Sequence, residues 1–343
     1  MKHTKSTFVK SAMICTALCF FVVVFSASQG IASDKEIKLK LTSSIATKNS
    51  PPGDSMDEWA KLIEENSKGR IKVRVFYSGE LGSQQEVFDQ VLRGNVDLLL
   101  DWAITAYDQR LGLMNAPYLV KSWEDAFEVL QPGGWLSKIY SGIYKDIGLK
   151  YFGPYPDGFG GVATKGKYAT SITEAKEKGI KVRSAAIFPL PETMRALGYQ
   201  VIPVGWSESY TAIQTGVVDG SSNNPIFWSY EYFRDIIDYY VHTRHTFAFG
   251  DLTMNQDKWN SLDTEDQKII SDAAAVVSQK QFVNGRAIDL EYRNKAIAAG
   301  IKYIEPSKEE IAEMEKVCKS DVWPLVEKAV GPEIMKIVRE NRQ

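Results

Sequence analysis

The chain has few of the residues that most often carry metal binding, nucleophilic catalysis or covalent cross-links. Its 343 residues include only three cysteines and three histidines, and its formal net charge is −2. So few cysteines cannot build a disulfide framework, and the fold must be held by its apolar core. The mild excess of acidic residues argues against nucleic acid as a partner, because a nucleic-acid-binding domain presents a strongly basic face.

The motifs that could indicate an enzyme are weak. His242 and His245 have an HxxH spacing, but the run 239–249 has a strand pattern, which would point the two rings to opposite faces. Residues 205–209 lack the second glycine of a nucleophile elbow. Residues 158–161 make a poor dinucleotide fingerprint. We therefore predict no metal, no cofactor and no catalytic activity.

The first 32 residues have the pattern of a secretory signal. Three lysines precede the apolar run 12–25, which is short for a membrane span, and Gly30-Ile31-Ala32 supplies small residues for cleavage before Ser33. An uncleaved membrane anchor is the alternative. We expect an exported protein, cleaved near Ala32.

Removal of that segment leaves 311 residues, which is enough for two domains. The remaining chain has 38 basic and 43 acidic residues, because the segment holds three lysines and no carboxylate. Cys318 is then the single cysteine and cannot form an internal disulfide. Its apolar, helical surroundings favour a small buried side chain over a reactive thiol.

Residues 36–100 alternate between strand and helix patterns. This rhythm predicts a parallel sheet with helices on its faces. The strands are expected at 36–41, 71–75 and 96–100, and the helices at 55–66 and, from the capping box Ser83–Glu86, to about Gly94. Further helices are expected from Ser122 and Gly134, and a strand at 149–153.

A second α/β pattern occupies residues 179–225. Strands are expected at 180–183, 200–204 and 217–218, helices at 191–197 and 207–215 with Ser207 as the N-cap, and a polar turn at 219–224. Ligands of such units bind at the carboxyl ends of the strands. Those ends carry Arg183, Trp206 and Asn223: an anion-binding fork, an aromatic wall and an amide.

The same segment resembles the substrate-binding proteins of tripartite ATP-independent periplasmic (TRAP) transporters, of the dicarboxylate-type DctP-like family. The matching motifs are GIKVR at 179–183, ALG at 196–198, PVGWSESYTAIQTGVVDG at 203–220 and the Asn-Pro turn at 223–225. The resemblance implies a type II-like periplasmic binding fold of two α/β lobes, with a long helix at 264–299 spanning both.

We divide the chain after the signal into two domains on this basis. Domain I comprises residues 33–154 and 245–343, and domain II comprises residues 155–244. The chain would cross near Pro154–Gly158 and again in the run 239–249. Two crossing strands form a hinge that permits closure around a ligand.

The resemblance also implies the ligand contacts. Arg183 would hold a carboxylate, Asn223 would donate to it or accept from a hydroxyl, and the Trp206 ring would pack on the carbon skeleton. Approximate alignment adds polar contacts from the first lobe and rings around the ligand. These additional candidates are Ser44, Gln84, Trp102, Phe159 and Phe188.

One departure from the family bears on the ligand. Many members place a second arginine in the strand that enters the second domain, whereas this chain has Gly158-Phe159-Gly160-Gly161. A buried carboxylate without a partner costs several kcal/mol. We therefore hypothesise a monocarboxylate, including one with an aromatic or bulky apolar tail, in the space that the missing arginine leaves.

The resemblance implies a periplasmic receptor, expected to be monomeric, that delivers a small organic acid to the large and small subunits of a TRAP permease. Two alternatives stay open at this point. One is the binding protein of an ATP-driven importer, which a neighbouring ATPase gene would indicate. The other is an exported hydrolase, which would need a nucleophile and base or a metal cluster.

Overall fold

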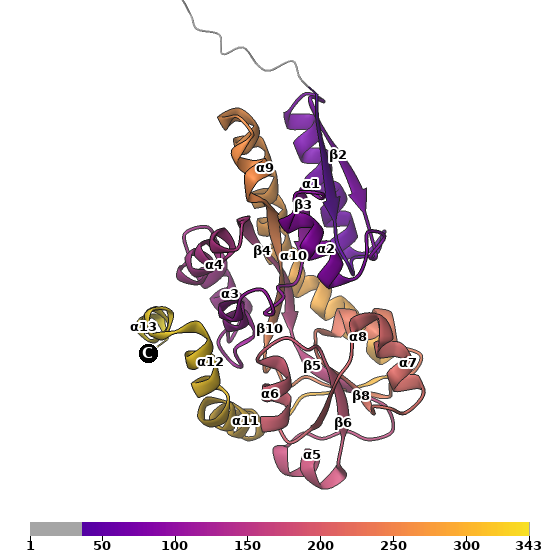
Figure 1. Ribbon diagram of the computed structural model, residues 1–343. Coiled ribbons are helices and arrows are strands. Elements are labelled where there is room, and N and C mark those ends of the chain that lie inside the picture. The colour runs from indigo at the N-terminus through magenta and orange to yellow at the C-terminus, as the bar shows by residue number, and fades with distance from the viewer. Residues whose placement is uncertain (1–35, 343) are drawn as a thin grey trace, which may run out of the picture. The chain divides into compact units, whose positions relative to one another are not determined.

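The computed structural model describes residues 36–342, and the expected signal at residues 1–32 lies outside them (Figure 1). The described chain forms one compact unit built on two β-sheets. Within this range, no helix has both the length and the hydropathy needed to cross a membrane.

The first sheet has five strands in the order β2-β1-β3-β10-β4. Strands β1, β2 and β3 are parallel, as the alternation in residues 36–100 predicts, whereas β10 runs antiparallel to β3 and β4. The strands are β1 (Ile37–Thr42), β2 (Ile71–Phe76), β3 (Leu98–Asp101), β4 (Leu149–Phe159) and β10 (Phe247–Asn255).

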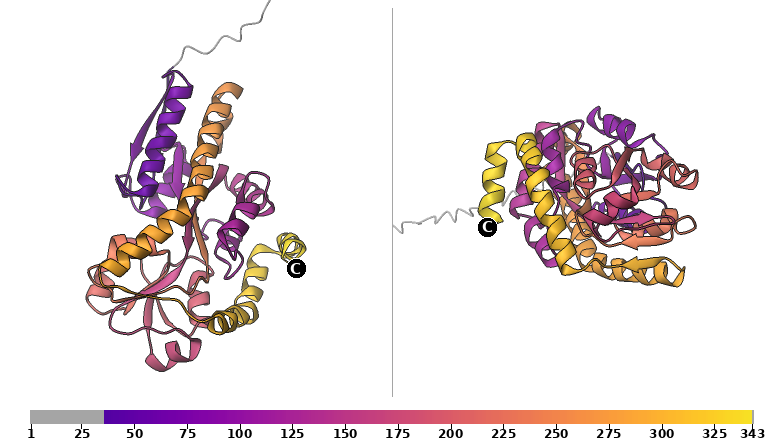
Figure 2. Two further views of the ribbon diagram at one scale, coloured as in Figure 1. Left: turned by 180° about the vertical axis from the view of Figure 1, so that it is seen from behind. Right: turned by 90° about the horizontal axis from the view of Figure 1, so that it is seen from below.

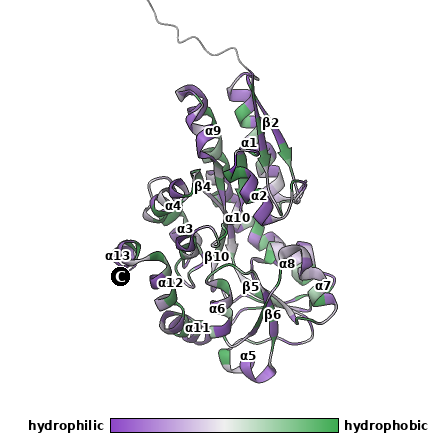
Figure 3. Ribbon diagram, in the orientation of Figure 1, coloured by the Kyte–Doolittle hydropathy of each residue, from purple (hydrophilic) through white to green (hydrophobic). Residues whose placement is uncertain are grey.

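Amphipathic helices cover this sheet, and the described helices show both hydrophobic and hydrophilic residues (Figure 3). Helix α1 begins at Pro51, earlier than predicted, because the Ser50 side chain accepts from Gly53 N–H; the capping box predicted at Ser83 and Glu86 is confirmed at α2. The helical elements are α1 (Pro51–Asn66), α2 (Gln84–Leu92), η1 (Gln109–Asn115), α3 (Trp123–Leu130) and α4 (Trp135–Asp146).

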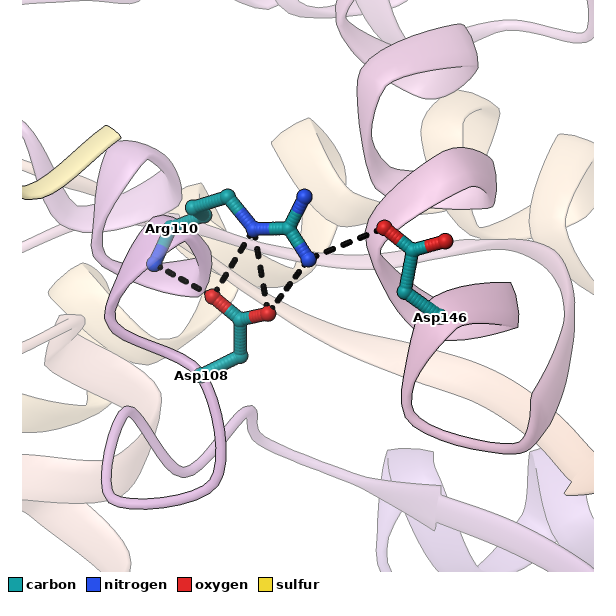
Figure 4. A network of polar contacts seen from close by, with 3 residues as sticks. All are labelled: Asp108, Arg110 and Asp146. Atoms are coloured by element: carbon teal, nitrogen blue, oxygen red, sulfur yellow. Dashed lines mark hydrogen bonds and ion pairs between the residues drawn. The ribbon is translucent and has the colours of Figure 1, made fainter. Parts of the chain in front are cut away.

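An ion network joins the loop after β3 to α4. The Arg110 guanidinium, at the start of η1, lies between Asp108 and Asp146 (Figure 4). Its Nη2 is 2.6 Å from Asp108 Oδ2 and 3.0 Å from Asp146 Oδ2, and its Nε is 3.0 Å from both oxygens of Asp108. The hydrogen bonds from Arg110 lower the pKa of Asp108, so this carboxylate stays ionised.

The second sheet has six strands in the order β11-β9-β5-β8-β6-β7. Strands β7, β6 and β8 are parallel, so their carboxyl ends share one edge. The strands are β5 (Gly161–Thr164), β6 (Lys181–Ser184), β7 (Gln200–Pro203), β8 (Gly220–Asn224), β9 (Tyr239–Val241) and β11 (Lys302–Ile304). The helical elements between them are α5 (Ile172–Lys178), α6 (Leu190–Ala196), η2 (Trp206–Glu208), α7 (Ser209–Gln214) and α8 (Ile226–Phe233).

Two local predictions in this segment are wrong. Ser207 caps no helix, because residues 206–208 form the 3₁₀ turn η2 and α7 begins at Ser209 without a side-chain cap. The predicted polar turn at 219–224 contains strand β8, whose serines and Asn223 are buried. The polar strand is stable because its side chains find partners, such as the bond of 2.9 Å from Ser222 Oγ to the Arg183 carbonyl.

The chain passes between the sheets at Gly160 and at residues 242–246, and these two segments are hydrogen-bonded to each other. Gly160 N–H lies 2.9 Å from the Thr246 carbonyl, and Arg244 N–H lies 3.0 Å from the Gly160 carbonyl. The first crossing comes later than predicted, because β4 stays in the first sheet through Phe159. The second crossing, at residues 242–246, divides the predicted strand 239–249 into β9 and the start of β10.

Helix α10 (Thr264–Ala298) contacts elements of both sheets, as the resemblance implies. It packs on α1 and β4 of the first lobe and on α8 and β11 of the second, and it forms the long orange ribbon in Figure 2, left. The short α9 (Gln256–Asn260) precedes it. Strand β11 joins the second sheet, although our division assigned residues 245–343 to domain I.

The C-terminal helices also contact both lobes. Helix α11 (Lys308–Asp321) packs on α6 of the second lobe, and α12 (Trp323–Val330) packs on η1 of the first. Helix α13 (Pro332–Asn341) then contacts α4. The two lobes are therefore linked by α10 and by the C-terminal helices as well as by the two predicted crossings.

Candidate ligand-binding site between the two sheets

A cavity of about 110 Å³ lies between the two lobes, at the edge where β6, β7 and β8 end. Its wall takes Gln84, Trp102 and Phe249 from the first lobe and Arg183, Trp206 and Asn223 from the second. The structure thus brings together Gln84, Trp102, Arg183, Trp206 and Asn223 from the predicted set. A space of this size suits a small molecule and not a polymer.

Arg183 is a buried cation without an anionic partner in the described chain. Its side chain comes from the third residue of β6, and the residue is only 4% exposed. Nε donates to the Val204 carbonyl at 2.8 Å, and the guanidinium carbon lies 5.4 Å from the centroid of the Trp206 ring. Burial lowers the pKa of Arg183 to about 10, which still leaves it charged at neutral pH.

The Asn223 side chain is held on three sides. Its Nδ2 donates to Ser184 Oγ at 3.1 Å and to Ser222 Oγ at 2.9 Å. Its Oδ1 lies 2.9 Å from His245 Nε2, and Thr243 Oγ1 lies 2.6 Å from the other ring nitrogen. Burial lowers the pKa of His245 to about 3, so the ring is neutral, with the Nε2 hydrogen on Asn223 and Nδ1 accepting from Thr243.

This network limits what Asn223 offers a ligand. Both amide hydrogens are used within the protein, while Oδ1 has a second lone pair. The predicted donation to a carboxylate therefore does not fit this geometry, and acceptance from a ligand hydroxyl or N–H does. The backbone contributes to this placement, because Asn223 has φ of 72°, in the left-handed region that asparagine tolerates better than most residues.

Indole rings form the apolar side of the cavity. Trp228, which the sequence analysis did not single out, lies edge-to-face against both Trp102 and Trp206, with centroid distances of 5.3 and 5.9 Å. The Trp206 ring also packs on Tyr232 at 4.8 Å. The rings support one another, so they can present fixed surfaces to a ligand.

Gln84 and Ser44 mainly organise Asp101, at the end of β3. Gln84 Nε2 lies 3.3 Å from Asp101 Oδ1 and 2.9 Å from the Trp102 carbonyl, and Ser44 N–H donates to Asp101 Oδ2 at 2.8 Å. Gln84 reaches the cavity wall, whereas Ser44 does not. These bonds compensate in part for the burial that raises the pKa of Asp101.

Phe188 and Phe159 lie outside the cavity wall. Both pack in a hydrophobic cluster of the first lobe, Phe188 so close to Gly112 that a Cβ there would be 2.6 Å from its ring. Phe159 packs edge-to-face on Phe247 at 5.0 Å. Their predicted contacts with the ligand are not supported by this geometry.

The position of the missing second arginine is filled by the protein itself. A Cβ on Gly160 would lie 2.7 Å from the Asn223 carbonyl oxygen, and one on Gly161 would lie 2.5 Å from the Tyr240 ring. The expectation that the missing arginine leaves space for the ligand is therefore wrong. Both glycines allow the crossing segments to approach closely.

Sequence reasoning missed Asp157 and Thr246 on the cavity wall. Asp157 lies near the end of β4, in the Tyr-Pro-Asp-Gly run that we assigned to a crossing point. Thr246 Oγ1 is buried and has no hydrogen-bond partner among the described residues. The available signal for Asp157 was a carboxylate in a run of β4 that is otherwise uncharged from Tyr151 to Phe159.

The two histidines lie in the segment between β9 and β10. His245 is bonded to Asn223 as described, and the His242 ring lies 5.6 Å from the Tyr303 ring. In residues 36–342, no three His, Cys, Asp or Glu side chains are grouped in a way that could hold a metal ion.

Two α/β lobes flank a cavity whose buried guanidinium has no anionic partner in residues 36–342, and this arrangement is that of a two-lobed solute-binding protein. Residues 42–328 match the family model described as bacterial extracellular solute-binding protein, family 7 (DctP), and the chain belongs to that family. This confirms the resemblance drawn from the motifs at 179–225. The family and the fold are those of transport solute-binding proteins.

Individual relatives are similar to this chain at low sequence identity, one by sequence and two by structure. The ectoine-binding periplasmic protein TeaA of Halomonas elongata is 27% identical over 267 residues, which is 72% of this chain and 73% of TeaA. The TRAP solute-binding protein of Desulfovibrio salexigens with bound orotic acid is 21% identical, with TM-score 0.81 over 89% of this chain and 98% of that one. That of Sulfurospirillum deleyianum with bound succinate is 22% identical, with TM-score 0.78 over 89% and 99%.

Proposed function

We propose that this chain is an exported receptor that captures a small organic acid in the cavity and delivers it to the membrane subunits of a TRAP permease. The observation that carries the proposal is the Arg183 guanidinium, which is buried in the cavity wall and has no anionic partner in residues 36–342. A ligand carboxylate supplies that partner.

The energetics support a carboxylate at this position. A buried charge is costly when it is unpaired, and a guanidinium holds a carboxylate through two parallel hydrogen bonds. Nε of Arg183 is already bonded to the Val204 carbonyl, while neither Nη has a hydrogen bond to another residue in the range 36–342. These nitrogens are the donors for the ligand. Micromolar affinity needs about −8 kcal/mol, which one such pair and contacts with the indoles can supply.

A single carboxylate fits the charges of the wall better than two. Arg183 is the one cation among the described residues that line the cavity, and Asp157 is an additional acid. A second carboxylate would meet no cation among these residues, and its charge would be buried without a partner. The relatives include proteins with bound orotic acid and with bound succinate, so the family alone does not decide between the two classes.

The test is a thermal-shift screen of the chain lacking residues 1–32. It compares monocarboxylates such as orotate and benzoate with the dicarboxylates succinate and malate. A ligand that binds only the folded state raises Tm in proportion to the logarithm of its excess over Kd. We expect shifts from some monocarboxylates in the unmodified chain and in Arg110→Met, and none in Arg183→Met. Arg110 is the matched control because its guanidinium is paired with carboxylates and does not line the cavity.

Two results would contradict parts of this proposal. Shifts that persist in Arg183→Met would show that the guanidinium does not anchor the ligand. Strong shifts from succinate and malate, with none from monocarboxylates, would retain the receptor and overturn the monocarboxylate.

A further inference from the structure

Asp157 places a buried carboxyl group on the cavity wall. It comes from β4, near the end that leads into the crossing at Gly160, and is 8% exposed. Its Oδ2 accepts from Trp228 Nε1 at 3.1 Å. Among residues 36–342, Trp228 Nε1 makes the one hydrogen bond of normal geometry to this carboxyl group, and the Trp102 indole also lies near it. Oδ1 therefore has acceptor capacity left for a ligand in the cavity.

No cation of the described chain compensates Asp157. It forms no ion pair with Arg183, although both side chains line the same cavity. The influences on its ionisation are burial and hydrogen bonds from the indoles of Trp228 and Trp102. Among the described residues, the cavity wall therefore holds one cation and one carboxyl group, and neither has a charged partner in that part of the chain.

The indole rings add a second, independent feature. Trp228 donates to Asp157, and Trp102 and Trp206 both pack edge-to-face on Trp228. Indole faces attract cations through the quadrupole of the ring, and they do so more strongly in a site from which water is excluded. A carboxyl group beside several indoles is a suitable environment for a cationic nitrogen with apolar substituents.

We propose that the ligand is a zwitterion, whose carboxylate binds Arg183 and whose cationic nitrogen binds Asp157 among the indoles of Trp102 and Trp228. This inference rests on the proposed function and specifies its substrate class. Each charge of the ligand then meets the opposite charge in the wall. The whole complex is neutral at the site, which offsets the desolvation of both protein groups.

The ionisation of Asp157 agrees with this assignment. Burial raises its pKa to about 8, because the ligand-free wall offers the carboxylate only hydrogen bonds and no positive charge. A cationic nitrogen within hydrogen-bond distance would favour the ionised form. A ligand without such a nitrogen gains no attraction between opposite charges from Asp157.

The experiment is calorimetric titration with acids that are paired by length. The probes are the ω-amino acids from β-alanine to 6-aminohexanoate together with nipecotate, each beside the corresponding acid without nitrogen. They are titrated into the unmodified chain, Asp157→Asn and Asp251→Asn. Asp251 is the matched control, since it is a buried carboxyl group whose pKa burial also raises to about 8, but it is bonded to Tyr144 and does not line the cavity.

We expect the best amino acid to bind the unmodified chain at least about tenfold more tightly than its nitrogen-free counterpart. Asp157→Asn should weaken that amino acid about 100-fold and leave the counterpart within about threefold, because only the charged contact is lost. Asp251→Asn should change neither.

The inference is overturned if the nitrogen-free acids bind as tightly as the amino acids and if Asp157→Asn leaves the ratio of their two Kd values unchanged. If those acids still depend on Arg183, the proposed function survives this failure. If no acid of either series binds the unmodified chain, the proposed function fails, and the zwitterion fails with it.

Discussion

Two arginines of this protein have opposite surroundings. Arg110 lies between Asp108 and Asp146 at a partly exposed junction of η1 and α4, and four hydrogen bonds tie its side chain to these carboxylates. Arg183 is buried in the second lobe, and in residues 36–342 its guanidinium makes one hydrogen bond, to a backbone carbonyl. Both guanidinium groups are charged at neutral pH, but within that range only Arg110 has counter-charges beside it.

Arg110 makes interactions that stabilise the fold, whereas the charge of Arg183 stays without a counter-charge in the described part of the chain. The ion pairs of Arg110 are made when the chain folds, so they contribute to the free energy of unfolding. The charge of Arg183 is desolvated without a counter-charge, so it lowers that free energy until a ligand binds. A charged group that costs stability and faces a cavity indicates function.

The largest expected effect comes from changing the shape of the Arg183 cation and keeping its charge. Arg183→Lys should weaken binding of the best organic acid found in the screen about 150-fold, or about 3 kcal/mol, because an ammonium cannot reproduce the planar fork. Arg110→Lys should leave Kd unchanged. Titration calorimetry gives both values, and a loss below about threefold for Arg183→Lys would mean that charge alone holds the ligand.

The next effect concerns the pH dependence of stability without ligand. Asp157 has a folded-state pKa of about 8, above the value of about 3.9 for an unfolded aspartate. Between these values the folded chain binds the proton more tightly, so the contribution of this group to stability falls as pH rises. The free energy of unfolding of Asp157→Asn, taken relative to that of the unmodified chain, should therefore rise by about 2 kcal/mol from pH 6 to pH 8.

Urea titrations at pH 6 and pH 8 measure this change. Asp251→Asn should show a similar gain, because burial raises the pKa of Asp251 to about 8 as well. A gain for Asp251→Asn with none for Asp157→Asn would show that the cavity hydrates Asp157 well enough to keep its pKa ordinary.

A third effect tests the bonds that hold Asn223. His245→Leu removes the donor to Asn223 Oδ1 and leaves the Thr243 hydroxyl without its ring partner. We expect a loss of about 1.5 kcal/mol in the free energy of unfolding, from unsatisfied buried polar groups. The loss should shrink as pH falls towards 3, because the neutral, buried ring of the unmodified chain itself costs stability below about pH 6.5.

Chemical denaturation at pH 7 and pH 5 checks this sign. A variant that is equally destabilised at both values would mean that His245 titrates at its ordinary pKa in the folded chain.

The second-lobe site was predictable because its determinants are local. Arg183, Trp206 and Asn223 follow three strands whose alternation and breaks can be read from one segment of 47 residues, numbers 179–225. Parallel pairing of β7, β6 and β8 then brings the strand ends to one edge. The first and last residues of the strands were harder to predict, since β8 is made of polar residues that only tertiary hydrogen bonds stabilise as a strand.

The rest of the cavity and its surroundings depend on contacts between segments that are far apart in the sequence, and no local sequence pattern predicts these contacts. Asp157 looks like a turn residue between Pro156 and Gly158, and its burial follows from the pairing of β4 with β10. Phe159 and Phe188 were assigned to the ligand because apolar periodicity does not distinguish an aromatic ring in a core from one beside a cavity. The space at Gly160 was misjudged for the same reason, since the Asn223 backbone that fills it is 63 residues away in sequence.

The smallest expected effect completes the comparison of the two arginines. Arg110→Met removes the ion pairs with Asp108 and Asp146 and should lower the free energy of unfolding by about 1 kcal/mol, because solvent screens a pair at a partly exposed site. The loss should become smaller in 1 M salt, where the Debye length is about 3 Å. Arg183→Met should have the opposite sign and leave the ligand-free chain at least as stable, since an apolar side chain replaces an uncompensated buried charge. Denaturant titrations of both variants without ligand decide the matter, and a destabilised Arg183→Met would mean that the bond to Val204 and the contact with Trp206 already compensate the charge.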